Sequence, residues 1–177
     1  MNVHSYSKKL NKAIRYYIEK LPAISEEVFQ QNPIQGEWSY SEVYSHLIAA
    51  NGLTLRGLEK CIDGTAKLMT RPAHWKARLI LFLGKLPGKQ KVPAILESTI
   101  KKIDKKEAEQ GMKHLQKLLN DLMPRIEKAP KNQGLKHPRM GLLNAVQWIR
   151  FMQIHTEHHI PQLKRIDKIF ENNLIES

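Results

Sequence analysis

Residues 144–166, NAVQWIRFMQIHTEHHIPQLKRI, decide the fold of this chain. One set of positions in the stretch recurs at steps of four, three, four, three and four residues. They are Trp148, Met152, His155, His159, Gln162 and Ile166. This spacing puts all six on one face of an α-helix and is typical of the inner seam of a helix bundle. We expect the helix to begin at Asn144, which forms a capping-box pattern with Gln147, and to run to about Glu171.

Three more long helices are predicted from apolar residues that recur every three or four positions. They cover Ser5–Gln30, Ser39–Ile62 and Lys105–Glu127. The second has the clearest start, because Ser39 and Glu42 form a capping box and Trp38 and Val43 are placed for a hydrophobic staple. Proline interrupts helical hydrogen bonding, so we expect kinks at Pro22 and Pro161, and a kink or early end at Pro124.

The segments between these helices are rich in Gly and Pro. Residues 65–103 are interpreted as a long crossover with a shorter helix over Ala73–Gly84, and Asn132–Gly141 as a loop. We find no alternating pattern that would indicate a β-strand. The predicted fold is therefore all-α: a four-helix bundle whose long crossover, between the second and third helices, holds one or two short helices. Residues 1–177 should form a single domain.

The chain has 177 residues and a formal net charge of +12, which favours anionic partners. Nucleic acid, an acidic membrane surface and a carboxylate- or phosphate-bearing small molecule all fit. The single cysteine, Cys61, excludes an intrachain disulfide and fits a reducing compartment, so we expect the cytoplasm. The N-terminal MNVHSYSKKL has no apolar segment typical of a secretory signal. The longest apolar run, Leu79–Leu83, is too short to span a membrane.

Two histidines on the inner seam, His155 and His159, lie one helical turn apart, where both imidazoles can bind one metal ion. Buried imidazoles need partners, and a metal would supply one. His46, one turn after Glu42 on the second helix, is a candidate third ligand. The alternative for each is a core histidine that is satisfied by the protein itself. A pair with this spacing is also expected by chance in a chain with 8 histidines, so spacing alone leaves both open.

Two blocks of this sequence resemble the DinB-like superfamily of metal-binding four-helix bundles. The first, Trp38-Ser39-x-x-Glu42-Val43-x-x-His46-Leu47, is similar to the signature of its second helix. The second joins His137-Pro138-x-x-Gly141-x-Leu143-x-x-x-Gln147-Trp148 to His155-Thr156-x-His158-His159-x-x-Gln162, and looks like its final loop and helix. The blocks occur in the expected order and spacing, and with the helix pattern the resemblance extends over essentially the whole chain.

The resemblance implies that His46, His155 and His159 bind a divalent metal, usually zinc or nickel in such families. Nitrogen ligands suit both ions. Gln162 is a candidate to orient His159 or a metal-bound water, and His158 is a candidate neighbour or substitute ligand. Glu42 is a candidate base, although its capping role already accounts for it. No catalytic residue is assigned from the sequence.

The resemblance further implies a metal-dependent enzyme, which we expect to be an S-transferase that uses a low-molecular-weight thiol cofactor against electrophilic small molecules. The first alternative is a hydrolase that uses metal-bound hydroxide. The basic surface suits an anionic or thiol-bearing ligand, and the chain lacks an unambiguous general base. A further alternative is a non-enzymatic basic bundle that binds nucleic acid or anionic surfaces. Nucleic acid is disfavoured because no nucleic-acid-binding signature is present. A homodimer through Ala73–Gly84 is also considered.

Overall fold

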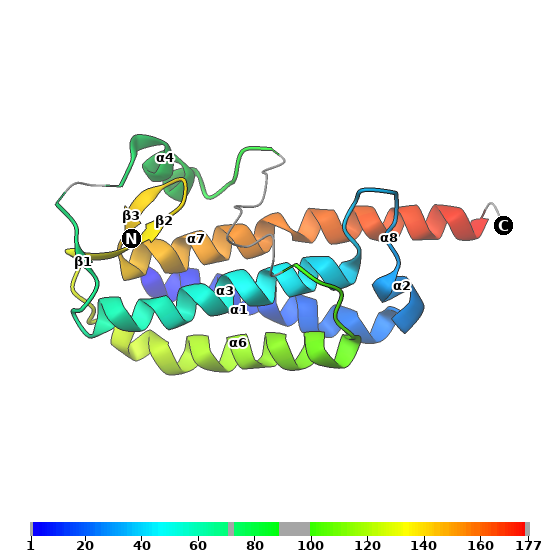
Figure 1. The fold of residues 1–177 in the computed structure, drawn as a ribbon, viewed down its shortest axis with the longest axis horizontal. Helices are drawn as coiled ribbons and strands as arrows, with labels where there is room; N and C mark the ends of the chain where they lie inside the picture. Colours follow the sequence, from blue (N-terminus) through cyan, green and yellow to red (C-terminus); the bar gives the residue numbers. More distant parts are fainter. Residues whose placement is uncertain (1, 71–72, 89–99, 176–177) are drawn as a thin grey trace.

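Four long helices lie side by side in the part of the chain that the structure describes (Figure 1). This computed structural model describes residues 2–70, 73–88 and 100–175. The long helices are α1 (Val3–Lys20), α3 (Tyr40–Ile62), α6 (Lys105–Ile126) and α7 (Ala145–His158). The predicted four-helix bundle is therefore confirmed.

The core of the bundle is formed by the facing apolar stripes of these helices. α1 packs against α6 and α7, and α3 packs against the same two helices, so α1 and α3 occupy opposite corners. Fully buried residues mark each stripe, and they include Leu10, Tyr17, Leu47, Leu119 and Ile149. Both predicted capping boxes are present, Ser39 with Glu42 and Asn144 with Gln147. These caps satisfy backbone N–H groups that no helical partner can reach.

The prediction of one kinked helix over residues 5–30 is wrong, because the chain breaks there. α1 ends at Lys20, a 3-10 turn covers Leu21–Ala23, and a short helix α2 covers Glu26–Gln30. Ser25 begins α2, since its hydroxyl accepts a hydrogen bond from the Val28 N–H at 3.2 Å. Pro22 starts the break and the new cap completes it, so the chain turns instead of bending.

The last predicted helix is divided at His159, two residues before Pro161. α7 ends at His158 and α8 runs over Ile160–Ile175. Figure 1 shows α8 continuing in the direction of α7, beyond the end of the bundle. Because Pro161 has no N–H, it cannot complete the regular bonding of the turn before it. The break therefore lies inside the stretch that carries the paired histidines.

Pro124 has a smaller effect than expected, since α6 continues through it to Ile126. A proline in the last turn removes only one hydrogen bond, and too little helix follows for a kink to matter.

A small antiparallel sheet covers one end of the bundle, and the prediction of a loop without strands at 132–141 is wrong. β1 (Lys67–Leu68) pairs with β2 (Gln133–His137), which pairs with β3 (Gly141–Leu143). The strands are short, and burial along β2 does not alternate, which is why the sequence shows no strand pattern.

The crossover contains α4 (Trp75–Leu83), which confirms the short helix expected over Ala73–Gly84. α4 packs against α7 and lies beside β2 and β3 (Figure 1). It ends at Gly84, whose φ of 71° is left-handed, and the Arg150 guanidinium occupies the space that a side chain at Gly84 would need. The loop and break expected near Lys89 and Pro93 lie outside the described residues.

A polar cluster ties the start of α8 to two helices of the bundle. The Lys20 Nζ is 2.7 Å from both carboxylate oxygens of Asp167, and the Tyr40 hydroxyl donates a hydrogen bond to Asp167 Oδ1. Burial, followed by the interaction with Asp167, raises the pKa of Tyr40. The cluster fixes α8 where it leaves the break at His159.

None of the helices in the described residues has the length and apolar character needed to cross a membrane.

Candidate metal centre

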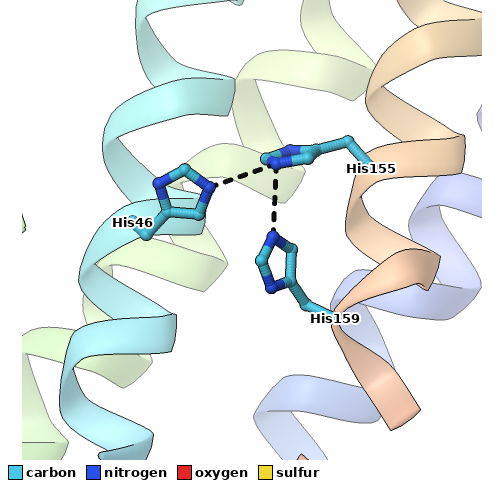
Figure 2. A group of neighbouring side chains, drawn as sticks. All are labelled: His46, His155 and His159. Atoms are coloured by element: carbon cyan, nitrogen blue, oxygen red, sulfur yellow. Dashed lines mark hydrogen bonds between the residues drawn. The ribbon is translucent and has the colours of Figure 1, made fainter. Parts of the chain in front are cut away.

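Three histidines from separate parts of the sequence converge between α3 and α7 (Figure 2). The His155 Nε2 is 3.1 Å from the His46 Nε2 and 3.2 Å from the His159 Nε2. His46 and His159 are buried and His155 is half-buried. The ligand atoms of all three lie within 4.8 Å of one another, so the structure brings together the three histidines singled out in the sequence.

The spacing of these nitrogens fits one tetrahedral metal ion. Metal–nitrogen bonds of about 2.05 Å at tetrahedral angles put two ligand nitrogens about 3.3 Å apart. The separations of 3.1 and 3.2 Å are close to that value. Without a cation, three ring nitrogens facing one another have too few protons to pair, and a buried group left in that state is destabilising. The three side chains could therefore hold a divalent ion.

Gln162 fixes the ring of His159. The Gln162 Oε1 is 2.8 Å from the His159 Nδ1. An amide oxygen accepts, so the hydrogen of this neutral imidazole is on Nδ1 and the lone pair is on Nε2, which faces the other two histidines. The Nδ1 of His46 is buried and has no hydrogen-bond partner among the described residues.

Burial keeps these imidazoles neutral, as metal ligands must be. Desolvation lowers the pKa of His46 to about 3 and that of His159 to about 4. It also takes the pKa of His155 well below the ordinary value, with a smaller effect from the neighbouring histidines. Each nitrogen lone pair is therefore available at neutral pH.

Two aromatic rings hold the cluster in place, and the sequence analysis gave neither of them this role. The Trp38 ring stacks on His159 at 6.3 Å and lies 5.2 Å from His46, and the Phe151 ring stacks on His155 at 5.7 Å. Phe151 is one turn before His155, which was a signal available in the sequence. Trp38 was assigned only to a staple.

The hydrogen bonds of Thr156 connect the site to α1 and α3. The Tyr17 hydroxyl donates to the Thr156 carbonyl at 2.9 Å, and the Asn51 amide donates to the Thr156 hydroxyl at 3.1 Å. Thr156 follows His155 directly, so these two bonds set the position of that turn of α7.

The other candidate residues lie in different places. His158 is half-buried beside His159, with ring centroids 5.5 Å apart, and burial lowers its pKa. The Glu42 Oε2 accepts hydrogen bonds from the Ser39 N–H at 2.8 Å and from the Asn32 amide at 2.8 Å. Glu42 therefore lies in the helix cap and does not join the group of three histidines.

The cluster forms part of the wall of a cavity of about 1150 Å³. Apolar and aromatic side chains dominate the wall, among them Trp38, Leu53, Ile80, Leu86, Met140, Trp148, Phe151 and Met152. The polar lining includes Glu37, Lys76, Arg139, His158 and Arg165, in addition to the clustered histidines. The Arg165 Nη2 pairs with the Glu37 Oε2 at 3.1 Å.

His137, which the sequence analysis quoted but gave no role, also lines this cavity. Its Nδ1 accepts the backbone N–H groups of Arg139 at 3.1 Å and Met140 at 3.2 Å. Burial, and then the charge of Arg139, lowers the pKa of His137 to about 4. The neutral ring therefore has its hydrogen on Nε2.

The fold and the group of three histidines define a DinB-like four-helix bundle that could hold a metal. The model of a family of proteins of unknown function, DUF1569, matches residues 8–166, and the chain belongs to this family. Among solved structures, the chain is similar to YfiT from Bacillus subtilis, described as a probable metal-dependent hydrolase with an unusual four-helix bundle topology. The TM-score is 0.64 and the identity 13%, over 96% of this chain and 87% of that one. No curated protein matches.

We expect the metal-free protein to lose stability as the pH falls from about 6.5 to about 4. Because folding depresses the pKa of His46, His137 and His159, the unfolded chain binds protons in this window that the folded chain does not. The free energy of unfolding should fall by about 1.4 kcal/mol per pH unit for each such histidine, and should level off above pH ~7. Urea unfolding of EDTA-treated protein at several pH values measures this slope. His46→Gln should make it shallower, and a flat profile would contradict the prediction.

Proposed function

We propose that His46, His155 and His159 bind one divalent metal ion, zinc or nickel, and that the chain is a metal-dependent enzyme for small molecules. The observation that carries this proposal is the position of the cluster: three neutral imidazoles, spaced for one ion, in the wall of a large apolar cavity. When bound, such an ion supplies a Lewis acid that makes a coordinated thiol or water more acidic.

The protein residues have separate tasks in this proposal. Gln162 holds the Nε2 of His159 toward the ion, and the stacked rings of Trp38 and Phe151 restrict the other orientations of the imidazoles. The apolar wall excludes water and binds the body of the substrate. Lys76, at the edge of the cavity, offers a cation to an anionic group of a ligand.

The reaction that we favour is transfer of a low-molecular-weight thiol to an electrophilic small molecule. Pockets for single drug-sized ligands occupy about 300–1,000 Å³. The cavity of about 1150 Å³ is larger, which supports two small molecules side by side. In the reaction the thiol gives up its proton, its sulfur forms a bond to the electrophilic carbon, and the leaving group departs with its bonding electrons.

Hydrolysis is the second candidate, and two observations support it. YfiT is described as a probable metal-dependent hydrolase. In this chain His158 lines the cavity beside His159, and the lowered pKa of its ring leaves it able to take a proton from water. The carboxylate of Glu37 is less suited to this role because it is engaged by Arg165.

One pair of assays separates the two reactions. Metal-loaded protein is incubated with an aryl halide, with and without cysteine or glutathione, and separately with an activated aryl ester in the absence of thiol. Thiol transfer predicts thiol-dependent loss of the halide, which disappears in His155→Ala. Hydrolysis predicts ester cleavage without thiol. An activity that is the same with and without metal would overturn both.

A further inference from the structure

Helix α4 has two faces with different surroundings. On its inner face Ala77 and Leu81 are buried, and the Arg150 Nε donates to the Leu81 carbonyl at 3.0 Å, which anchors the helix to α7. On its outer face four large apolar side chains are exposed to solvent. These are Trp75 (63% exposed), Leu79 (48%), Phe82 (83%) and Leu83 (59%). Such an amount of exposed apolar surface on one short helix is unusual for a protein surface that contacts only water.

This outer face is also strongly basic. Lys67, Lys76, Arg78 and Lys85 are exposed, and none of them forms an ion pair within the described part of the chain. The sequence has no Asp or Glu between Asp63 and Glu97. The Lys76 Nζ lies 5.5 Å from the centre of the Trp75 ring, so cations and apolar groups are interleaved. The partner of this face must therefore accept apolar side chains and provide negative charge.

We propose that the outer face of α4, defined by Trp75, Arg78, Leu79, Phe82, Leu83 and Lys85, docks on the surface of an anionic phospholipid bilayer. Aromatic and aliphatic side chains enter the boundary between head groups and acyl chains, while flanking lysines and arginines contact anionic head groups. No helix needs to cross the bilayer. Docking of this kind does not depend on a metal in the histidine cluster.

Two other partners explain the face less well. Nucleic acid would use the cations, but exposed Leu79, Phe82 and Leu83 would stay in water or displace water without gain. A second copy of this chain would cover the apolar groups. However, a two-fold axis brings the same surface together from both copies, so Arg78 and Lys85 would face like charges. A bilayer with anionic lipids satisfies both properties at once.

Flotation with lipid vesicles tests the proposal on the full-length protein. Vesicles made of equal parts phosphatidylglycerol and phosphatidylcholine should carry the protein, and vesicles of phosphatidylcholine alone should not. Arg78→Gln/Lys85→Gln should weaken binding about thirtyfold, since each cation near an anionic surface contributes about fivefold. Trp75→Ser/Phe82→Ser should weaken it at least about tenfold. EDTA should leave binding unchanged, which separates this result from the proposed enzymatic function.

Matched controls replace residues of the same kind on other faces. Ile34→Ser removes an apolar side chain that is 53% exposed, and Lys8→Gln/Lys9→Gln removes two exposed cations. Both should bind vesicles as the wild type does. Equal loss in the controls, no binding to anionic vesicles, or binding to DNA that survives Trp75→Ser/Phe82→Ser would overturn the proposal. So would a dimer in solution that this double substitution converts to a monomer.

Discussion

Protein with His155→Ala should purify without the metal that the wild-type chain carries. His155 is the central member of the cluster, because its Nε2 is the one within 3.2 Å of both other ring nitrogens. Two remaining imidazoles cannot match the affinity of three, so elemental analysis should find about one ion per wild-type chain and almost none in the variant. Metal-dependent turnover should fall with the metal content.

Two comparisons make the result on His155 specific. His158→Ala should keep its metal, because His158 is not part of the group of three. Gln162→Leu should keep the ligands but lose the bond to the His159 Nδ1, which lowers metal affinity by about 10- to 100-fold in a chelator competition. His114→Ala, on the exposed face of α6, controls for loss of any histidine. Full metal content in folded His155→Ala would refute the proposed site.

Asp167→Ala should destabilise the protein by about 3 kcal/mol. The substitution leaves the Lys20 ammonium, which is only 16% exposed, without its partner, and removes the acceptor of the buried Tyr40 hydroxyl. A charge left unpaired in this setting costs more than the original ion pair contributed. Urea unfolding monitored by circular dichroism measures the difference in free energy.

Replacement of the whole cluster should behave differently from removal of its centre. Lys20→Met/Tyr40→Phe/Asp167→Leu leaves no unpaired polar group, so most of the lost stability should return. The exposed ion pair between Lys113 and Glu109 is the matched control, and Glu109→Ala should cost less than about 0.5 kcal/mol. If Asp167→Ala were as mild as Glu109→Ala, the cluster would not hold α8 in place.

Local features of the fold could be predicted because they depend on residues within one or two turns. The two capping boxes and the seam from Trp148 to Ile166 belong to this class. The strands could not be predicted, because Lys67 pairs with Gly134 from a distant part of the sequence and neither strand is long enough to show alternation. The cap at Ser25 was missed because Pro22 was expected to bend the helix, and a bend and a break have the same local signal.

The candidate site divides in the same way. The spacing of His155 and His159 follows from one helix, whereas the meeting with His46 needs two helices in register, and it was the family resemblance that suggested it. The stacking of Trp38 on His159 is a tertiary contact across the break between α7 and α8. The sequence pattern assigned Trp38 to its own helix start, which is the only neighbourhood that a local pattern describes.

The hydroxyl of Tyr17 gives the site a property beyond its three ligands. By bonding to the carbonyl of Thr156, it makes α1 part of the support for the turn that carries His155. The imidazoles are thus preorganised by the folded bundle, and an ion that binds between them needs little rearrangement of the backbone. Binding of that kind adds its free energy to a structure that already exists, in contrast to the zinc fingers, whose chains fold only with metal.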